Sequence, residues 1–208
     1  MPRLSHLEIL VEEPSTEAAL EILVPMLLGP DLSFAILSHQ GKPDLLRKLP
    51  VLLRGYRRWI PEEWGIVVLT DSDGRDCLEQ KALLERMAHE ADFSTRSSTG
   101  DGGRFHVLNR LAVEELEAWF FGDVEALCGA YPGVPRTLGR RAPYRDPDAI
   151  RGGTWEALER ELQRAGHHLG GLAKIQAARE IAARMVPDRN LSRSFQAFRR
   201  GLLGLVGA

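Results

Sequence analysis

The sequence predicts an α/β protein, in which a parallel sheet flanked by helices is followed by an added C-terminal helical region. Two observations predict this class. Through residues 1–128, short apolar runs of strand length alternate with longer segments of helical periodicity, the pattern of parallel strands joined by right-handed crossovers. After residue 128 the strand-like runs stop and three helical patterns remain. We expect a single domain over residues 1–208, whose part 129–208 packs on an α/β core at 1–128.

The first two strand-helix pairs are predicted from apolar runs and from leucine spacing. Leu7–Val11 and Leu32–Ser38 are apolar runs of strand length. Ala18–Leu28 is apolar but too long for one strand, so it predicts a helix, which we expect Ser15 or Thr16 to cap. Leucines spaced three and four residues apart predict a second helix over 45–56.

The remaining elements follow in the same way. Gly65–Thr70 (GIVVLT) is a continuous β-branched run, typical of a strand covered on both faces. The prediction continues with a helix at Cys77–Glu90, a strand at Phe105–Leu108 and a helix at Val113–Leu127. A connection rich in Pro, Gly and Arg follows at 129–153, and then come helices at Trp155–Ala165, Leu172–Val186 and Ser192–Leu205. The last helix carries Phe195, Phe198, Leu202 and Val206 on one face, which we expect to pack onto the core.

Composition excludes several classes of protein. With 208 residues, 44% hydrophobic and 27% charged, the chain is neither disordered, nor collagen-like, nor a coiled coil. Its two cysteines, Cys77 and Cys128, are far apart and indicate neither a disulfide framework nor a structural zinc site. Because no apolar run approaches the ~20 residues of a membrane span, and acidic residues come too early for a signal peptide, we expect a cytoplasmic protein without a membrane partner.

Charge is distributed unevenly along the chain. Residues 1–135 carry 13 Lys/Arg and 22 Asp/Glu, a net −9, whereas residues 136–208 carry 14 and 7, a net +7. This asymmetry is consistent with a cation-binding region beside a surface that meets phosphate. Taken alone, it is better explained by ordinary Arg-rich helix faces, which are common. If Arg136, Arg140, Arg141 and Arg145 flank a cleft, the phosphate interpretation gains support.

Acidic residues follow two of the predicted strands. Glu12 and Glu13 end the first, and Asp71 and Asp73 end the third, before Gly74, which allows a sharp turn. Sites in open parallel sheets form beyond the carboxyl ends of strands. Two carboxylates about 4 Å apart repel by roughly 4 kcal/mol at an effective dielectric near 20, so they must protonate, accept water or hold a cation, and Mg²⁺ prefers such ligands. The alternative is that the DxD caps a turn and the following helix.

Five segments of the chain resemble motifs of known protein families. They are VEEPSTE (11–17), VVLTDSDG (67–74), VEELEAWFFGD (113–123), a helix around Lys174 and SRSF (192–195). A strand ending in Glu and a later strand ending in DxD resemble the Toprim domain of topoisomerases, primases and OLD-family nucleases, a Rossmann-like sheet. Over nearly its whole length, the chain is more similar to a Toprim-like family of uncharacterised bacterial proteins, a domain of unknown function.

The resemblance implies a Mg²⁺ (or Mn²⁺) site built by Glu13, Asp71 and Asp73. Glu17 stands where OLD-like nucleases have a second glutamate, and Lys174 corresponds to a lysine that assists phosphate chemistry. The glycine that commonly follows the first Toprim glutamate is absent, because Pro14 follows Glu13 and Glu13 follows Glu12. The choice between Glu12 and Glu13 therefore stays open, with Glu13 preferred for its spacing to Glu17.

The predicted helix at 113–127 offers further candidates. Glu114 and Glu117 are three residues apart and would supply a second metal or orient the ligands of the first. The alternative is a helix with solvated acids, which we favour for Glu115. Trp119 is expected in the core rather than as a base-stacking platform. Lys174 has its own alternative as a plain surface charge.

These observations lead to three functional hypotheses. The first is a Mg²⁺-dependent phosphodiester or phosphoryl-transfer enzyme, a nuclease acting on DNA or RNA. The second is a non-cleaving module that binds nucleic acid or nucleotide beside an ATPase partner, since the chain lacks a GxxxxGK[ST] loop of its own. A small-molecule phosphatase is weaker, because such enzymes usually place their DxD after the first strand. The sequence leaves the oligomeric state open.

Overall fold

The computed structural model describes residues 4–72, 74, 76–100 and 103–207. Four parallel strands form one sheet in the order β2-β1-β3-β4. They are β1 (His6–Val11), β2 (Ser33–Ser38), β3 (Trp64–Asp71) and β4 (Val107–Ala112). The predicted α/β class is confirmed.

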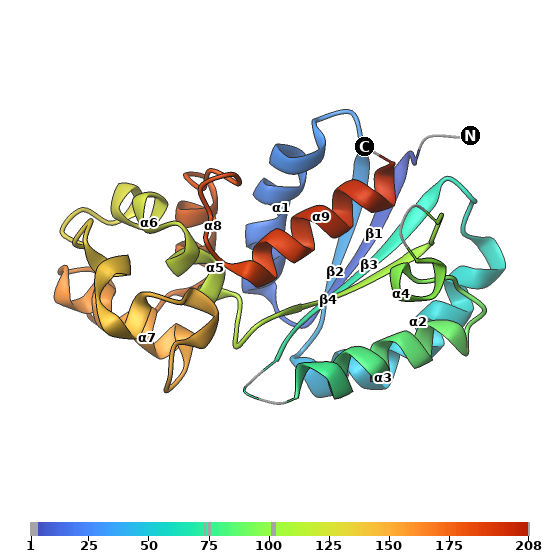
Figure 1. The fold of residues 1–208 in the computed structure, drawn as a ribbon, viewed down its shortest axis with the longest axis horizontal. Helices are drawn as coiled ribbons and strands as arrows, with labels where there is room; N and C mark the ends of the chain where they lie inside the picture. Colours follow the sequence, from blue (N-terminus) through green and yellow to red (C-terminus); the bar gives the residue numbers. More distant parts are fainter. Residues whose placement is uncertain (1–3, 73, 75, 101–102, 208) are drawn as a thin grey trace.

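Helices cover both faces of the sheet (Figure 1). One face carries α1 (Pro14–Leu28) and α9 (Arg193–Val206), and the other carries α2 (Lys42–Trp59) and α3 (Cys77–His89). Alternate side chains of β3 belong to the two corresponding cores: Val67 and Leu69 to the first, Ile66 and Val68 to the second. Burial on both faces explains why this strand is an unbroken apolar run.

A group of short helices extends beyond one end of the sheet (Figure 1). It begins where β4 ends, and we call it the α5–α8 lobe. It comprises α5 (Glu117–Gly122), α6 (Val124–Ala130), 3₁₀ turns at Leu138–Arg140, Ala142–Tyr144 and Pro147–Ala149, α7 (Thr154–Arg164) and α8 (Lys174–Ala182). Helix α8 packs on α1, and α9 returns along β4. The lobe therefore lies over the carboxyl ends of the strands.

The predicted helix at Val113–Leu127 is wrong. β4 continues to Ala112, and Glu114 has a φ of 63°, so residues 113–116 are not helical. Asp123 then divides the rest into α5 and α6, because its carboxylate accepts a hydrogen bond from the Ala126 N–H and caps α6. Glu114 and Glu117 consequently do not lie on one helix face. Trp119 is fully buried, as expected.

Two other details also differ from the prediction. Helix α1 begins at Pro14, which is tolerated at the first helical position, so Ser15 and Thr16 lie inside its first turn and Glu13 is the N-cap residue without a side-chain capping bond. The fourth strand lies at Val107–Ala112 rather than at 105–108. In the part of the chain that is described, no helix has the length and apolarity needed to cross a membrane.

Candidate functional site

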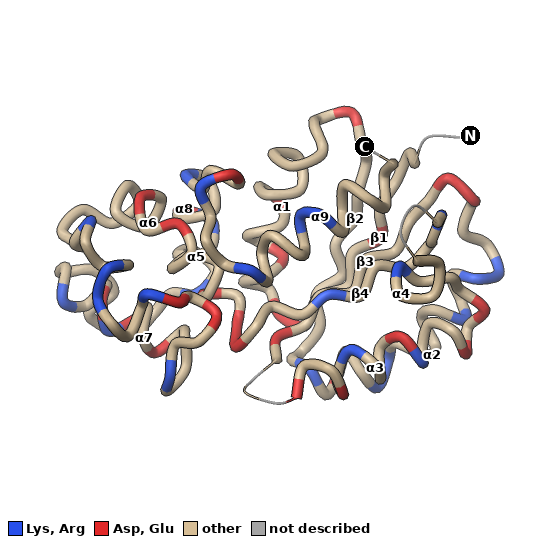
Figure 2. Tube along the Cα trace, in the orientation of Figure 1, with Lys and Arg blue, Asp and Glu red and all other residues tan. Residues whose placement is uncertain are grey.

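Acidic residues follow the carboxyl ends of three neighbouring strands. In the parallel register, Val11 pairs with Leu69, and Asp71 pairs with Ala112. Glu12 and Glu13 therefore leave β1 beside the end of β3, and Glu114 leaves β4 on its other side. Figure 2 shows acidic positions in red where the sheet meets the α5–α8 lobe. This is the edge at which parallel sheets form their sites.

Glu12 connects β1 to β3. Its side chain is buried, and Oε1 accepts hydrogen bonds from the backbone N–H of Asp71 at 2.5 Å and from Thr70 Oγ1 at 3.2 Å. These two bonds hold the ends of the adjacent strands together. Glu12 thus has a defined structural role, which favours Glu13 as the residue that faces the site.

Glu13 and Lys174 form an ion pair between the sheet and the lobe. Glu13 Oε1 accepts a hydrogen bond from Ser15 Oγ at 2.6 Å and lies 4.0 Å from Lys174 Nζ. Lys174 is the first residue of α8, and its ammonium also lies 5.0 Å from the centre of the Trp155 ring, a cation–π contact. About a third of the Lys174 side chain is exposed, so the ammonium is accessible to a ligand.

Lys174 is the cation on which several carboxylates of the site act electrostatically. Burial disfavours its charged form, but four carboxylates outweigh burial and raise the pKa of Lys174 above its usual value. They belong to Glu117, Glu13, Glu115 and Asp71. The structure thus brings four residues chosen from the sequence into one electrostatically coupled site: Glu13, Asp71, Glu117 and Lys174. Lys174 is part of this site rather than a plain surface charge.

Glu117 is the most deeply buried acid of the group. Its exposed fraction is 2%, and it starts α5. Burial raises its pKa to about 7, with a smaller contribution from the nearby carboxylates of Glu115 and Glu13, while Lys174 opposes the shift. A carboxyl with this pKa exchanges protons at neutral pH.

Glu114 and Glu115 have different positions. The backbone N–H of Glu114 donates to Ser72 Oγ at 2.7 Å, and Glu114 Oε2 lies 3.9 Å from where a Cβ would stand on Gly74. Gly74 has a φ of 65°, the conformation expected for the turn after the DxD. Glu115 is not solvated as predicted, because its Oε2 accepts hydrogen bonds from Thr154 and Trp155 at the start of α7.

The two other predicted ligands are less closely associated with Lys174. Glu17 is directed toward the end of β2, where Oε2 accepts a hydrogen bond from Ser38 Oγ at 2.5 Å. Asp73 lies outside the described residues.

The donors present are consistent with Mg²⁺. Among the residues that the structure describes, no three His, Cys, Asp or Glu side chains are arranged to hold one metal ion. Mg²⁺ in phosphoryl-transfer sites, however, often takes only one or two carboxylates, together with water and substrate phosphate. Glu13 and Asp71 lie at the ends of neighbouring strands, and both act electrostatically on the Lys174 ammonium. Their carboxylate oxygens are donors of the kind that Mg²⁺ prefers.

Sequence reasoning missed Lys42, a buried lysine at the first position of α2. Its Nζ donates to Gln80 Oε1 at 3.4 Å, and Gln80 Nε2 donates to the Ser72 carbonyl at 2.6 Å. This chain of contacts links α2 and α3 to the segment after Asp71. The available signal was position, since Lys42 follows the end of β2 by four residues and a site was expected beyond the strand ends.

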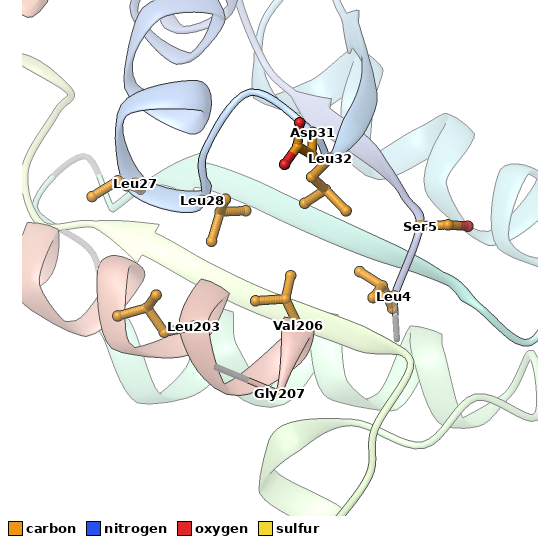
Figure 3. Close-up of a pocket in the computed structure, with 9 residues that line it drawn as sticks. All are labelled: Leu4, Ser5, Leu27, Leu28, Asp31, Leu32, Leu203, Val206 and Gly207. Carbon is orange, nitrogen blue, oxygen red and sulfur yellow. The ribbon is translucent and has the colours of Figure 1, made fainter. Parts of the chain in front are cut away.

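A separate hollow lies at the opposite end of the sheet (Figure 3). Its volume is about 510 Å³, and Leu27 and Leu28 of α1 face Leu203 and Val206 of α9 across it. Leu4 and Ser5, which precede β1, also line it. Because it lies where the strands begin, it does not belong to the acidic site.

Comparison with protein families gives a match over most of the chain. The model of a domain of unknown function, DUF4276, matches residues 11–203, from the last residue of β1 into α9. The matched range includes the acidic site and the α5–α8 lobe. No curated protein and no solved structure matches the chain. On the extent of the family match, the chain belongs to the DUF4276 family.

Proposed function

We propose that the protein is a Mg²⁺-dependent (or Mn²⁺-dependent) enzyme of phosphodiester hydrolysis or phosphoryl transfer, a Toprim-type nuclease acting on nucleic acid. The observation that carries the proposal is the convergence of Glu13, Asp71 and Glu117 on Lys174 at the carboxyl end of a parallel sheet. The order of the acidic motifs, which resembles that of Toprim domains, supports the same reaction class.

The residues of the site have distinct roles in this proposal. Glu13 and Asp71, with Asp73 by the resemblance, would hold the metal, which when bound would supply Lewis-acid activation of water and neutralise charge on the phosphate. Lys174 places a positive charge where negative charge develops on the phosphoryl group. Glu117 is suited to proton exchange because its pKa is about 7. Glu17, Glu114 and Glu117 are the candidates for a second metal.

The Lys174–Glu13 ion pair also favours a second candidate function. It gives Glu13 a cationic partner without a metal, as a module that binds but does not cleave would require. In that case the protein binds nucleic acid or nucleotide in a defence or repair system, and an ATPase partner supplies the energy. The two candidates predict the same ligand but differ in turnover.

Metal titration by calorimetry, followed by a cleavage assay in the same preparation, tests the proposal. Wild type should bind Mg²⁺ or Mn²⁺ and cleave DNA or RNA. Asp71→Asn should lose measurable binding and at least about 100-fold of the cleavage rate, because it removes a ligand charge from the metal. Thermal melting establishes that the variant folds.

Asp31→Asn is the matched control, because Asp31 is an exposed aspartate at the opposite end of the sheet, beside the hollow of Figure 3. It should retain both metal binding and cleavage. Metal binding without cleavage would favour the non-cleaving module. Absence of metal binding in the wild type would overturn the metal site altogether.

A further inference from the structure

A second pocket lies in the α5–α8 lobe and is lined by four arginines. Its volume is about 240 Å³. Arg136, Arg140, Arg145 and Arg189 contribute to its wall, and we call it the arginine pocket. The rings of Phe121 and Tyr144, which also line it, stack 5.1 Å apart with an angle of 7° between their planes. Figure 2 shows several basic positions in blue on the part of the lobe between α6 and α7.

Carboxylates neutralise only one of these four arginines. Arg189 donates to both oxygens of buried Asp123, at 2.7 and 3.0 Å, and to Glu125 at 2.9 Å. Arg136, Arg140 and Arg145 make no ion pair with any residue that the structure describes. Arg145 donates to the carbonyl of Arg140 at 3.4 Å. Asp123 and Glu125 also line the pocket, so four guanidinium groups stand against two carboxylates and the wall keeps a net positive charge.

Some other arginines around the lobe form ion pairs. Arg141 and Arg164 both pair with Glu161. Arg193, at the start of α9, pairs with Asp146. What distinguishes Arg136, Arg140 and Arg145 is that they share the wall of one concave space. Like charges directed into one concave space repel one another, and an anion in that space removes the repulsion.

We propose that the arginine pocket binds a phosphate group. Guanidinium groups present planar pairs of N–H donors that match two phosphate oxygens at once, and they remain charged at every physiological pH. The pocket is concave, so several guanidinium groups can reach one phosphate. A flat basic face would instead attract anions without positioning them.

The location of the pocket indicates which phosphate it takes, a step that rests on the proposed function. Helix α5 connects the two sites: Glu117 of the acidic site begins it, and Phe121 and Gly122 of the pocket end it. The rise between its first and last residues is about 8 Å. A strand of nucleic acid has phosphates on either side of the one that reacts. The arginine pocket holds such a neighbouring phosphate and positions the strand.

The test compares two charge-matched double variants. Arg136→Gln with Arg140→Gln removes two charges from the pocket, and Arg54→Gln with Arg58→Gln removes two exposed charges from α2 as the control. Binding of fluorescently labelled 12-nucleotide single-stranded DNA and RNA is measured by anisotropy in EDTA, with salt titrations. Because no divalent metal is present, failure of the proposed metal site does not affect this readout.

The pocket variant should bind oligonucleotide at least about 10-fold more weakly, and the slope of log affinity against log salt should fall by about 0.7 for the one phosphate that the pocket holds. The control variant should bind like the wild type. Inorganic phosphate and a mononucleotide are titrated by calorimetry in parallel. If the pocket variant loses only their binding, the phosphate site stands and its source is a small molecule. If neither kind of ligand distinguishes the two double variants, the proposal is overturned.

Discussion

Among single residues, Glu117 is the acid whose pKa burial raises into the neutral range. It lies beneath the lobe with 2% of its surface exposed, and its pKa is about 7 because water does not solvate the carboxylate. Lys174 limits the shift but does not cancel it. Burial thus favours the neutral form of this carboxyl.

This burial predicts a pH-dependent stability. The folded-state pKa of Glu117, about 7, exceeds its ordinary value of 4.5, so the folded protein binds this proton more tightly than the unfolded chain. Its contribution to stability is complete below pH 4.5 and is lost as pH rises to about 7. The variant Glu117→Gln stays neutral at every pH. We therefore expect its free energy of unfolding, relative to that of the wild type, to rise by up to about 3 kcal/mol between pH 4.5 and pH 8.

Urea denaturation at the two pH values measures this difference. Glu90→Gln is the control, because Glu90 is an exposed glutamate just after α3 and should show no such pH-dependent gain. An equal effect of Glu117→Gln at pH 4.5 and pH 8 would contradict the assignment of a raised pKa to this carboxyl.

Among the elements, α7 depends on a cap that comes from elsewhere in the chain. Its N-cap residue is Gly153, which has no side chain to offer. Glu115 Oε2 instead accepts hydrogen bonds from the N–H groups of Thr154 and Trp155, at 2.8 and 2.9 Å, and from Thr154 Oγ1 at 2.8 Å. A carboxylate at a helix N-terminus also suits the helix dipole. Glu115 thereby joins the segment after β4 to α7.

Removing this cap should destabilise the protein. We expect Glu115→Ala to lower the free energy of unfolding by about 1–3 kcal/mol, because it leaves two buried or half-buried N–H groups and a hydroxyl without their acceptor. Thermal or urea unfolding at neutral pH measures the change. Glu90→Ala should cost less than about 0.5 kcal/mol. Equal stability of the two variants would show that the cap contributes nothing.

The sequence predicted elements better than it predicted their ends. Periodicity identified the strands and helices because apolar alternation is a property of each segment by itself. The helix expected at Val113–Leu127 failed because two features of tertiary structure override it. Glu114 follows a strand that pairs up to Ala112, and Asp123 is held by Val186 N–H and Arg189 from a distant segment. No local pattern reports such contacts.

The candidate site was predictable only in part, for a similar reason. Glu13 and Asp71 could be found because the ends of parallel strands share an edge. The depth of Glu117 and the capping role of Glu115 could not, since both depend on how the α5–α8 lobe lies on that edge. The motif VEELEAWF contains both residues, but its spacing does not distinguish a buried acid from a capping one.

At the scale of the whole molecule, α9 connects the sheet to the lobe. Phe195 and Phe198 of α9 are fully buried against Trp119 of α5, with ring centres 5.3 and 5.0 Å apart. The same core includes Leu7 of β1 and Val67 of β3. The acidic site lies between the two parts that this core joins. Its geometry therefore depends on the last helix, although no residue of α9 takes part in it.

Phe198→Ala should consequently weaken the sheet and the lobe together. We expect a loss of about 3–5 kcal/mol in free energy of unfolding, since a fully buried aromatic ring leaves a cavity. Circular dichroism and tryptophan fluorescence should report one coincident transition, because a single core unfolds as a unit. Val206→Ala, on the same helix but half-buried beside the hollow of Figure 3, should cost about 1 kcal/mol or less. Two separate transitions in the Phe198 variant would instead mean that the lobe and the sheet unfold independently, and the acidic site would then be a contact between two autonomous units.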